Sequence, residues 1–249
     1  MTVKAYIYKE ITEHLRKYRL FTLGALTLIL AFSSPVILYF LPKIIANQTQ
    51  SPMDLSTLFQ VGQIPAIQSY IGDMYEIAGV LIIIFCSGLL LNEIKSQSIV
   101  IPFTNGLKPK QMIITKYLVY VTCVGIITFI GFVVNHYYSG LVFKSFDANI
   151  SLTLNAYVSY MAFVSFHIAL AICISQYTRN LFATIVLTLM SYFIMPGLFE
   201  LMSIKISMYQ LTSSFQLIPF SNHLTLSLIT TLISIVILLY ISTRKRIEL

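Results

Sequence analysis

Side chains that could do chemistry are few in this chain and widely scattered. Only four of its 249 residues are histidine and nine are acidic. No G-x-x-x-x-G-K-[ST] phosphate loop, H-E-x-x-H zinc motif or G-x-S-x-G nucleophile elbow occurs. Cys86, Cys123 and Cys173 lie in apolar runs, without the spacing of a metal site or a disulfide framework. The sequence therefore predicts no catalytic residues, no metal ligands and no cofactor bound by this chain.

Five residues inside or beside long apolar runs remain candidates for a transport pathway or gate. His167 lies deep in such a run, where a polar group costs free energy unless it meets a partner. Glu76 and Glu200 lie near the predicted outer ends of two other runs, and Pro196-Gly197 could break the second of these. Simpler alternatives stay open. His167 could hydrogen-bond a neighbouring Ser or Tyr, and either glutamate could reach the headgroups.

The elements that position these residues are membrane spans. Hydrophobic residues make up 57% of the chain and charged residues 10%, whereas soluble domains are about 25% charged. About twenty apolar residues in a helix cross a hydrocarbon core of about 30 Å. Six stretches meet that length, at about residues 20–41, 74–92, 113–135, 157–177, 181–202 and 225–242. We predict an all-α membrane protein with one transmembrane domain over residues 1–249. A re-entrant element between spans five and six stays open.

Basic residues fall almost entirely on one side of these six spans, which predicts that both termini are cytoplasmic. The predicted inner side holds Lys4, Lys9, Arg16, Lys17, Arg19, Lys95, Lys108, Lys110, Lys116, Arg179, Arg244, Lys245 and Arg246. The outer side holds only Lys43, Lys144 and Lys205. Because the basic groups lie beside span ends, anionic lipid headgroups explain the net charge of +7. Membrane lipid is thus an expected partner and nucleic acid is not.

The N-terminal residues carry a pattern unlike that of the spans. Val3, Ile7, Ile11, Leu15 and Tyr18 recur at three- and four-residue steps, which places them on one face of a helix. Charged residues occupy the other faces. We predict an amphipathic helix over residues 1–19 at the inner membrane surface, its apolar face in the headgroups or against a partner. A merely charged tail is the alternative.

The predicted inner loop between spans two and three, residues 93–112, is longer than a connector needs. It carries a short apolar run, Ile99 to Ile101, and then the turn signal Thr104-Asn105-Gly106 and a basic segment. Glycine permits the positive φ that such a turn can require. Apolar side chains on a water-facing loop indicate a docking surface for a cytoplasmic partner.

At this loop the chain resembles the permease subunit of an ABC-2 type transporter, a small six-span exporter driven by a separate ATPase. The family's acidic residue, Ser/Gly/Thr cluster, apolar run, turn and basic residues have counterparts here, in order: Glu93, Ser96 and Ser98, Ile99 to Ile101, Thr104 to Gly106, Lys108 or Lys110, and Lys116. Gln97 stands where the family has Gly, and Lys108-Pro109 where it has Ser-Arg. The amphipathic N-terminus, the tight turn at residues 178–180 and the basic C-terminal ending extend the resemblance over the whole chain.

The resemblance implies a multi-pass protein of a bacterial plasma membrane that is not itself an enzyme. Two permease subunits, alike or different, would pair above two copies of a cytoplasmic ATPase that binds ATP and Mg²⁺. It implies that the following residues form the ATPase interface: Ile7, Ile11, Leu15, Glu93, Ser98, Thr104, Asn105, Gly106, Lys108 and Lys110. Antimicrobial peptides, amphipathic toxins and drugs are the substrates we favour.

Two other classes of protein remain to be weighed against an exporter subunit. A proton- or cation-coupled secondary transporter could use Glu76, Glu200 or His167, but such carriers more often have ten or more spans, internal repeats and acids nearer the midplane. No internal repeat is evident in this sequence. An intramembrane enzyme lacks a recognisable nucleophile or metal set.

Overall fold

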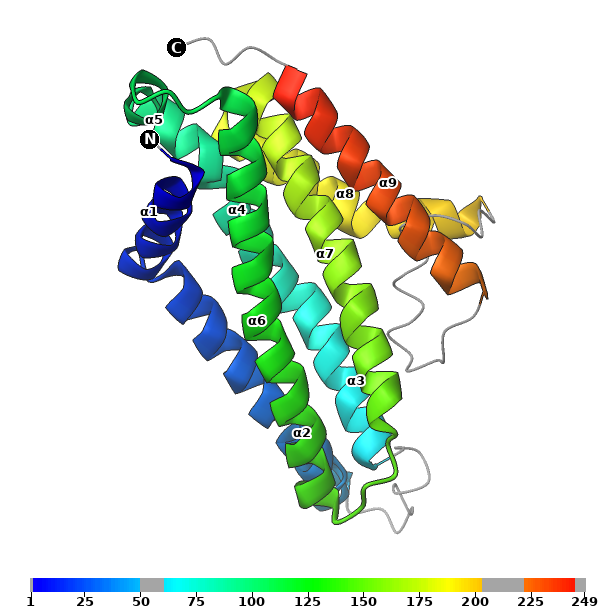
Figure 1. Ribbon diagram of the computed structural model, residues 1–249. Coiled ribbons are helices and arrows are strands. Elements are labelled where there is room, and N and C mark those ends of the chain that lie inside the picture. The colour runs from blue at the N-terminus through cyan, green and yellow to red at the C-terminus, as the bar shows by residue number, and fades with distance from the viewer. Residues whose placement is uncertain (1, 50–60, 203–221, 245–249) are drawn as a thin grey trace.

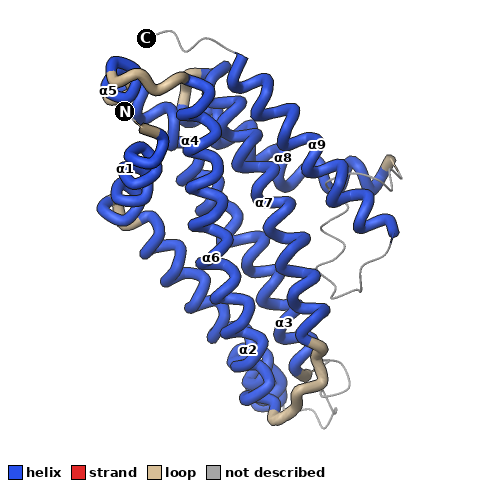
Figure 2. The backbone as a smooth tube through the Cα atoms, in the orientation of Figure 1, coloured by secondary structure: helices blue, strands red, loops and turns tan. Residues whose placement is uncertain are grey.

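The computed structural model describes residues 2–49, 61–202 and 222–244, and within them it contains helices and no strand (Figure 2). The helices, in chain order, are α1 (Val3–Arg16), α2 (Arg19–Thr49), α3 (Gln63–Asp73), η2 (Met74–Ala78), α4 (Gly79–Lys95), α5 (Val100–Thr104), α6 (Pro109–Phe143), α7 (Ile150–Thr178), α8 (Leu181–Leu201) and α9 (Asn222–Arg244). The segments α3, η2 and α4 follow one another without interruption.

Six of these helical stretches are long and apolar enough to cross a membrane, which confirms the prediction of an all-helical chain with six such segments. They cover Arg19–Pro42, Gln63–Lys95, Pro109–Phe143, Ile150–Thr178, Leu181–Phe199 and Thr225–Arg244. The short helices α1 and α5 lie at one end of the bundle, together with the C-terminal end of α9 (Figure 1). An even number of spans brings the two ends of the chain to the same end of the bundle, as seen here.

Three of the spans extend well beyond the predicted boundaries, all at the end of the bundle opposite α1. The second begins at Gln63 rather than near residue 74, the third continues to Phe143, and the fourth begins at Ile150. Polar residues there end the apolar runs but not the helices, and one of them, Gln63, bonds to α6 and to the loop that follows it. Gln63 Nε2 donates to the carbonyl of His136 at 3.1 Å, and Gln63 Oε1 accepts from the amide of Ala148 at 2.9 Å.

α7 forms the centre of the bundle and packs against α4, α6, α8 and α9, while α2 lies along α6 (Figure 1). The main core joins these helices through large buried side chains such as Phe132, Phe163 and Tyr192. The two spans nearest the C-terminus, α8 and α9, have the smallest buried shares of the six. Their outward faces are apolar, as a lipid or protein neighbour would require.

α8 continues through Pro196 to Leu201, so the break that Pro196-Gly197 could have made does not occur. Proline has no N–H, which leaves the carbonyl four residues earlier, that of Tyr192, without its helical donor. The Tyr75 hydroxyl donates to that carbonyl at 2.9 Å. A bond from another helix therefore replaces the missing one. The re-entrant element considered between spans five and six falls mostly on residues 203–221, outside the described residues.

Candidate functional site

A buried group of four alternating charges joins three helices at the end of the bundle that holds α1. We call Lys9, Glu10, Glu93 and Lys116 the junction cluster. Lys116 Nζ lies 2.9 Å from both carboxylate oxygens of Glu10 and 3.1 Å from Glu93 Oε2. Lys9 Nζ lies 3.0 Å from Glu10 Oε1 and also contacts Glu93 Oε1. The two cations and two carboxylates thus balance, and they link α1 to α4 and α6.

Burial makes these ion pairs important for stability, because a buried charge without a partner is costly. The side chains of Glu10, Glu93 and Lys116 are each less than 5% exposed. Burial alone would raise the pKa of Glu10, but the Lys116 ammonium outweighs it and holds that pKa below its ordinary value. Burial likewise opposes the charge of Lys9, but the hydrogen bond to Glu93 raises its pKa. Each charge is stable here only because its partners are present.

The spacing of residues explains how α1 reaches this position. Tyr6, Glu10 and His14 recur every four residues and form the buried face of α1. Glu10 meets Lys116 of α6, and the His14 ring lies 5.3 Å from that of Tyr120, one turn further along. α1 therefore runs beside the first turns of α6. Its start is capped by Thr2, whose hydroxyl accepts from the amide of Ala5 at 3.4 Å.

The predicted apolar face of α1 points away from the bundle. Val3, Ile7, Ile11, Leu15 and Tyr18 are all exposed, from 36% for Ile11 to 70% for Tyr18. The amphipathic helix is therefore present, and its polar-looking face is the one that packs on the protein. Its apolar face is left for lipid or a partner, as the sequence predicts.

The loop between α4 and α6 folds into an elbow anchored on the same helix. We define the elbow as residues 96–108, including α5. Its Ile99 and Leu107 are buried in an apolar cluster with Tyr6 of α1, Leu90 and Met112. The chain turns at Gln97 and Gly106, which have φ of 55° and 83°. The positive φ expected at the glycine is confirmed.

The residues proposed for the ATPase interface lie in three places: the elbow and the start of α6, the exposed face of α1, and the junction cluster. Thr104, Asn105, Gly106, Lys108 and Lys110 are exposed on and beside the elbow, and Ser98 is half-buried with its hydroxyl 2.9 Å from that of Ser96. Ile7, Ile11 and Leu15 are exposed on α1. Glu93 differs, because it is 3% exposed and engaged with Lys9 and Lys116. Its place in the fold is that of a positioning residue rather than a contact.

Metal binding is the other chemistry that this cluster of carboxylates suggests. Oxygens of Glu10, Glu13 and Glu93 lie within 4.8 Å of one another. Ammonium groups already occupy the space between them, since Lys9 bridges all three. A metal ion would have to displace that lysine, so the arrangement is built for internal ion pairs.

The pathway and gate candidates are spread over a second region, where α8 meets the α3–η2–α4 span. His167 is fully buried, with Nδ1 2.9 Å from the carbonyl of Phe163 and its ring 4.9 Å from that of Tyr192. Glu76 is exposed on η2. The Glu200 side chain lies outside the described set. The structure thus brings His167 close to α8.

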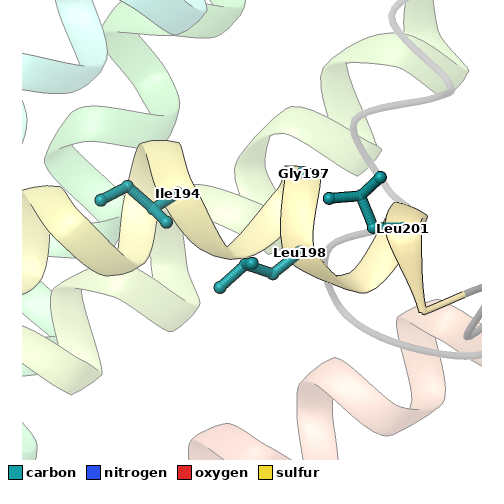
Figure 3. A pocket seen from close by; sticks show the side chains of 4 residues that line it. All are labelled: Ile194, Gly197, Leu198 and Leu201. Atoms are coloured by element: carbon teal, nitrogen blue, oxygen red, sulfur yellow. The ribbon is translucent and has the colours of Figure 1, made fainter.

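Pro196 and Gly197 lie on the outward part of α8. Gly197 lines an apolar pocket of about 570 Å³ together with Ile194, Leu198 and Leu201 (Figure 3). These four lining residues come from this one helix and are apolar. The pocket has the character of a lipid- or protein-facing surface.

Two tyrosines that the sequence analysis passed over connect these helices. The rings of Tyr75 and Tyr192 stack at 4.8 Å and 19°. Tyr75 donates to the Tyr192 carbonyl, and Tyr192 donates to the Tyr75 carbonyl at 3.0 Å. Tyr75 lies in η2, a π-helical segment of a kind often found at functional positions. Gly79 makes room for the pair, since an added Cβ would overlap the Tyr192 hydroxyl.

Comparison with known proteins gives no relative to set beside this geometry. No family model, curated protein or solved structure matches the chain.

Sequence reasoning missed the junction cluster and the tyrosine pair for different reasons. Glu93 and Lys116 were noted singly, but Lys9 and Glu10 looked like solvated charges on an amphipathic helix. The four-residue spacing of Tyr6, Glu10 and His14 was the available signal. For the tyrosines the signal was Pro196, because it predicts an unpaired carbonyl at Tyr192.

Proposed function

We propose that this chain is the membrane-spanning permease subunit of an ABC-2 type exporter in the plasma membrane. A separate ATPase, in two copies, binds ATP and Mg²⁺, and a second permease subunit, alike or different, completes the pathway. Amphipathic peptides, toxins or drugs are the substrate class that we favour.

The observation that carries this proposal is the junction cluster. It ties α1 to the inner ends of α4 and α6, and the apolar cluster around Tyr6 ties α1 to the elbow. The elbow and α1 thus pack together as one unit that is continuous with two spans. A partner that pushes on this unit moves α4 and α6 with it, as a two-state transporter needs.

The exposed side chains and charges at the elbow suit the binding of a protein partner. Ile101 is 62% exposed on α5, beside the exposed Thr104 and Asn105. Lys110 adds positive charge next to it. An apolar anchor with a polar and cationic rim is the pattern of a docking surface.

Gly106 gives the sharpest test of this docking role. With φ at 83°, its conformation is closed to proline, whose ring holds φ near −65°. Gly106→Pro should reshape the tip, because proline cannot adopt this φ and cannot donate the N–H that Gly106 gives to the Phe103 carbonyl at 2.9 Å. We expect it to abolish stimulation of ATP hydrolysis in proteoliposomes containing the cognate ATPase. Gly106→Asn is the matched control, since asparagine tolerates positive φ, and it should retain stimulation.

Co-purification identifies the ATPase before that test. A chain carrying a G-x-x-x-x-G-K-[ST] motif should purify with this protein from the membrane of its own cell. Absence of such a chain would remove the exporter proposal itself. Equal stimulation by Gly106→Pro and the unmodified protein would remove only the docking role of the elbow.

A further inference from the structure

An apolar groove runs between α1 and the first turns of α6, outside the junction cluster. Its volume is about 250 Å³. Val3 and Ile7 form one wall, and Ile114, Leu118 and Val119 form the other. Among the residues that the structure describes, no carboxylate lines it, and it opens on the side of α1 that faces away from the bundle.

Two lysines flank the end of this groove that lies nearest the elbow. Lys4 follows Val3 directly and lies one helical turn before Ile7. Lys108 is the N-cap of α6, and its amide donates to the side chain of Gln111, a residue of the groove wall, at 3.3 Å. Both lysines are exposed, and neither is ion-paired with a carboxylate in the described part of the chain.

The stretch of α6 between Lys108 and the far end of the groove corresponds to one leaflet of a bilayer. From Lys108 to Leu118 is ten residues of helix, or about 15 Å, which is half of a hydrocarbon core of about 30 Å. The lysines at one end could contact a phospholipid headgroup, and the apolar wall next to them could contact its acyl chain. The charge favours an anionic headgroup.

We propose that an anionic phospholipid of the inner leaflet binds here, with its headgroup phosphate at Lys4 and Lys108 and one acyl chain along Ile7, Ile114 and Leu118. The lipid then fills the space between the outer face of α1 and α6. It holds α1 from outside while the junction cluster holds it from inside. Ile7 and Lys108 contact lipid in this arrangement, and Ile11, Leu15 and the elbow tip remain for the ATPase.

The absence of tryptophan from the chain makes a direct test feasible. Leu118→Trp introduces a single fluorophore on the groove wall at a residue that is 54% exposed. Ile126→Trp, two turns further along α6 and 58% exposed, is the matched control outside the groove. Each variant is reconstituted in vesicles that contain either brominated phosphatidylglycerol or brominated phosphatidylcholine at equal mole fraction.

Bound anionic lipid predicts stronger quenching of L118W by brominated phosphatidylglycerol than by brominated phosphatidylcholine, with no difference for I126W. Lys4→Gln and Lys108→Gln should each lower the preference about fivefold. Lys144→Gln, at the opposite end of α6, should leave it unchanged. Should L118W not fold, Val3→Trp on the facing wall provides the same readout.

Three results would overturn the site. Equal quenching of L118W by the two lipids would show no preference for an anionic headgroup. A preference that survives the loss of both Lys4 and Lys108 would place the headgroup elsewhere. Loss of lipid quenching when the ATPase is added would mean that protein, and not lipid, occupies the groove.

Discussion

The Lys116 ammonium lies between two carboxylates from different helices, Glu10 of α1 and Glu93 of α4. Lys116→Met would leave these two buried carboxylates with Lys9 alone. Breaking a buried pair in this way costs about 3–5 kcal/mol. We expect a large fall in the Tm of the purified protein for Lys116→Met and for Glu10→Gln. The double variant should lose less than the two single losses together, because the remaining pair of Lys9 and Glu93 is balanced.

An exposed pair on the same helix is the control for this cycle. Lys17 and Glu13 lie 2.6 Å apart at i and i+4, with Lys17 47% exposed. Surface pairs of this kind contribute about 0.3–0.5 kcal/mol. Lys17→Met should therefore barely change Tm. An equally small effect of Lys116→Met would show that the junction cluster does not hold α1.

His14 makes the attachment of α1 sensitive to pH. Burial lowers its pKa to about 4 from an ordinary value of 6.5. The surrounding charges act on it in opposite directions, the carboxylates of Glu10 and Glu13 against Arg19 and Lys116. Because the folded protein prefers the neutral ring, the stabilisation is complete above pH 6.5. It is lost as pH falls from 6.5 towards 4, and the full shift corresponds to about 3 kcal/mol.

A reporter on α1 would follow this loss. Tyr6→Trp places the chain's single tryptophan in the buried face of α1, and its emission should shift to the red as pH falls from 7 to 4.5. His14→Phe should remove the change in that window, since phenylalanine cannot be protonated. Glu10 does not interfere, because its lowered pKa delays its own loss of stabilisation to more acidic pH. An unchanged titration in the phenylalanine variant would assign the effect to another group.

At the scale of the helices, Pro196 and Tyr75 compensate for each other. The Tyr192 carbonyl has no helical donor because of Pro196, and the Tyr75 hydroxyl replaces that donor. Tyr75→Phe should cost about 1–3 kcal/mol, the penalty for a buried carbonyl without its donor. Adding Pro196→Ala should restore most of the stability, since residue 196 then supplies the N–H itself.

Tyr157→Phe is the matched control for this exchange. The Tyr157 hydroxyl also donates to a helix carbonyl, that of Gly125, at 3.0 Å. That carbonyl lies within α6, where no proline removes its helical donor. Its loss should cost only about 0.5–1.5 kcal/mol. Equal losses for the two tyrosines, or no rescue by Pro196→Ala, would contradict the compensation.

The same helices show what the sequence could and could not predict. Hydropathy located six spans and an amphipathic α1 because burial in lipid requires apolar residues at a known period. It made three spans too short at the end of the bundle opposite α1, since the bonds of Gln63 to α6 and to Ala148 join positions more than seventy residues apart. It read Glu10 as solvated for the same reason, because its partner Lys116 follows 106 residues later. Local patterns do not encode such pairings.

At the scale of the whole molecule, orientation in the membrane decides whether the elbow can meet a cytoplasmic partner. The C-terminal ends of α4 and α9, which are Lys95 and Arg244, lie at the same end of the bundle as α5 (Figure 1). Lys144, the C-cap of α6, lies at the opposite end. The excess of cations predicts that the elbow faces the cytoplasm.

Cysteine labelling in intact cells tests this orientation directly. After Cys86, Cys123 and Cys173 are replaced, Thr104→Cys and Lys144→Cys provide single exposed thiols at the two ends. A membrane-impermeant maleimide should label only the variant at Lys144, and a permeant one should label both. Labelling of Thr104→Cys from outside would put the elbow, α1 and the junction cluster beyond the reach of ATP. The stability predictions for Lys116 and Tyr75 would stand in that case, since they depend on packing alone, but the exporter proposal would fall.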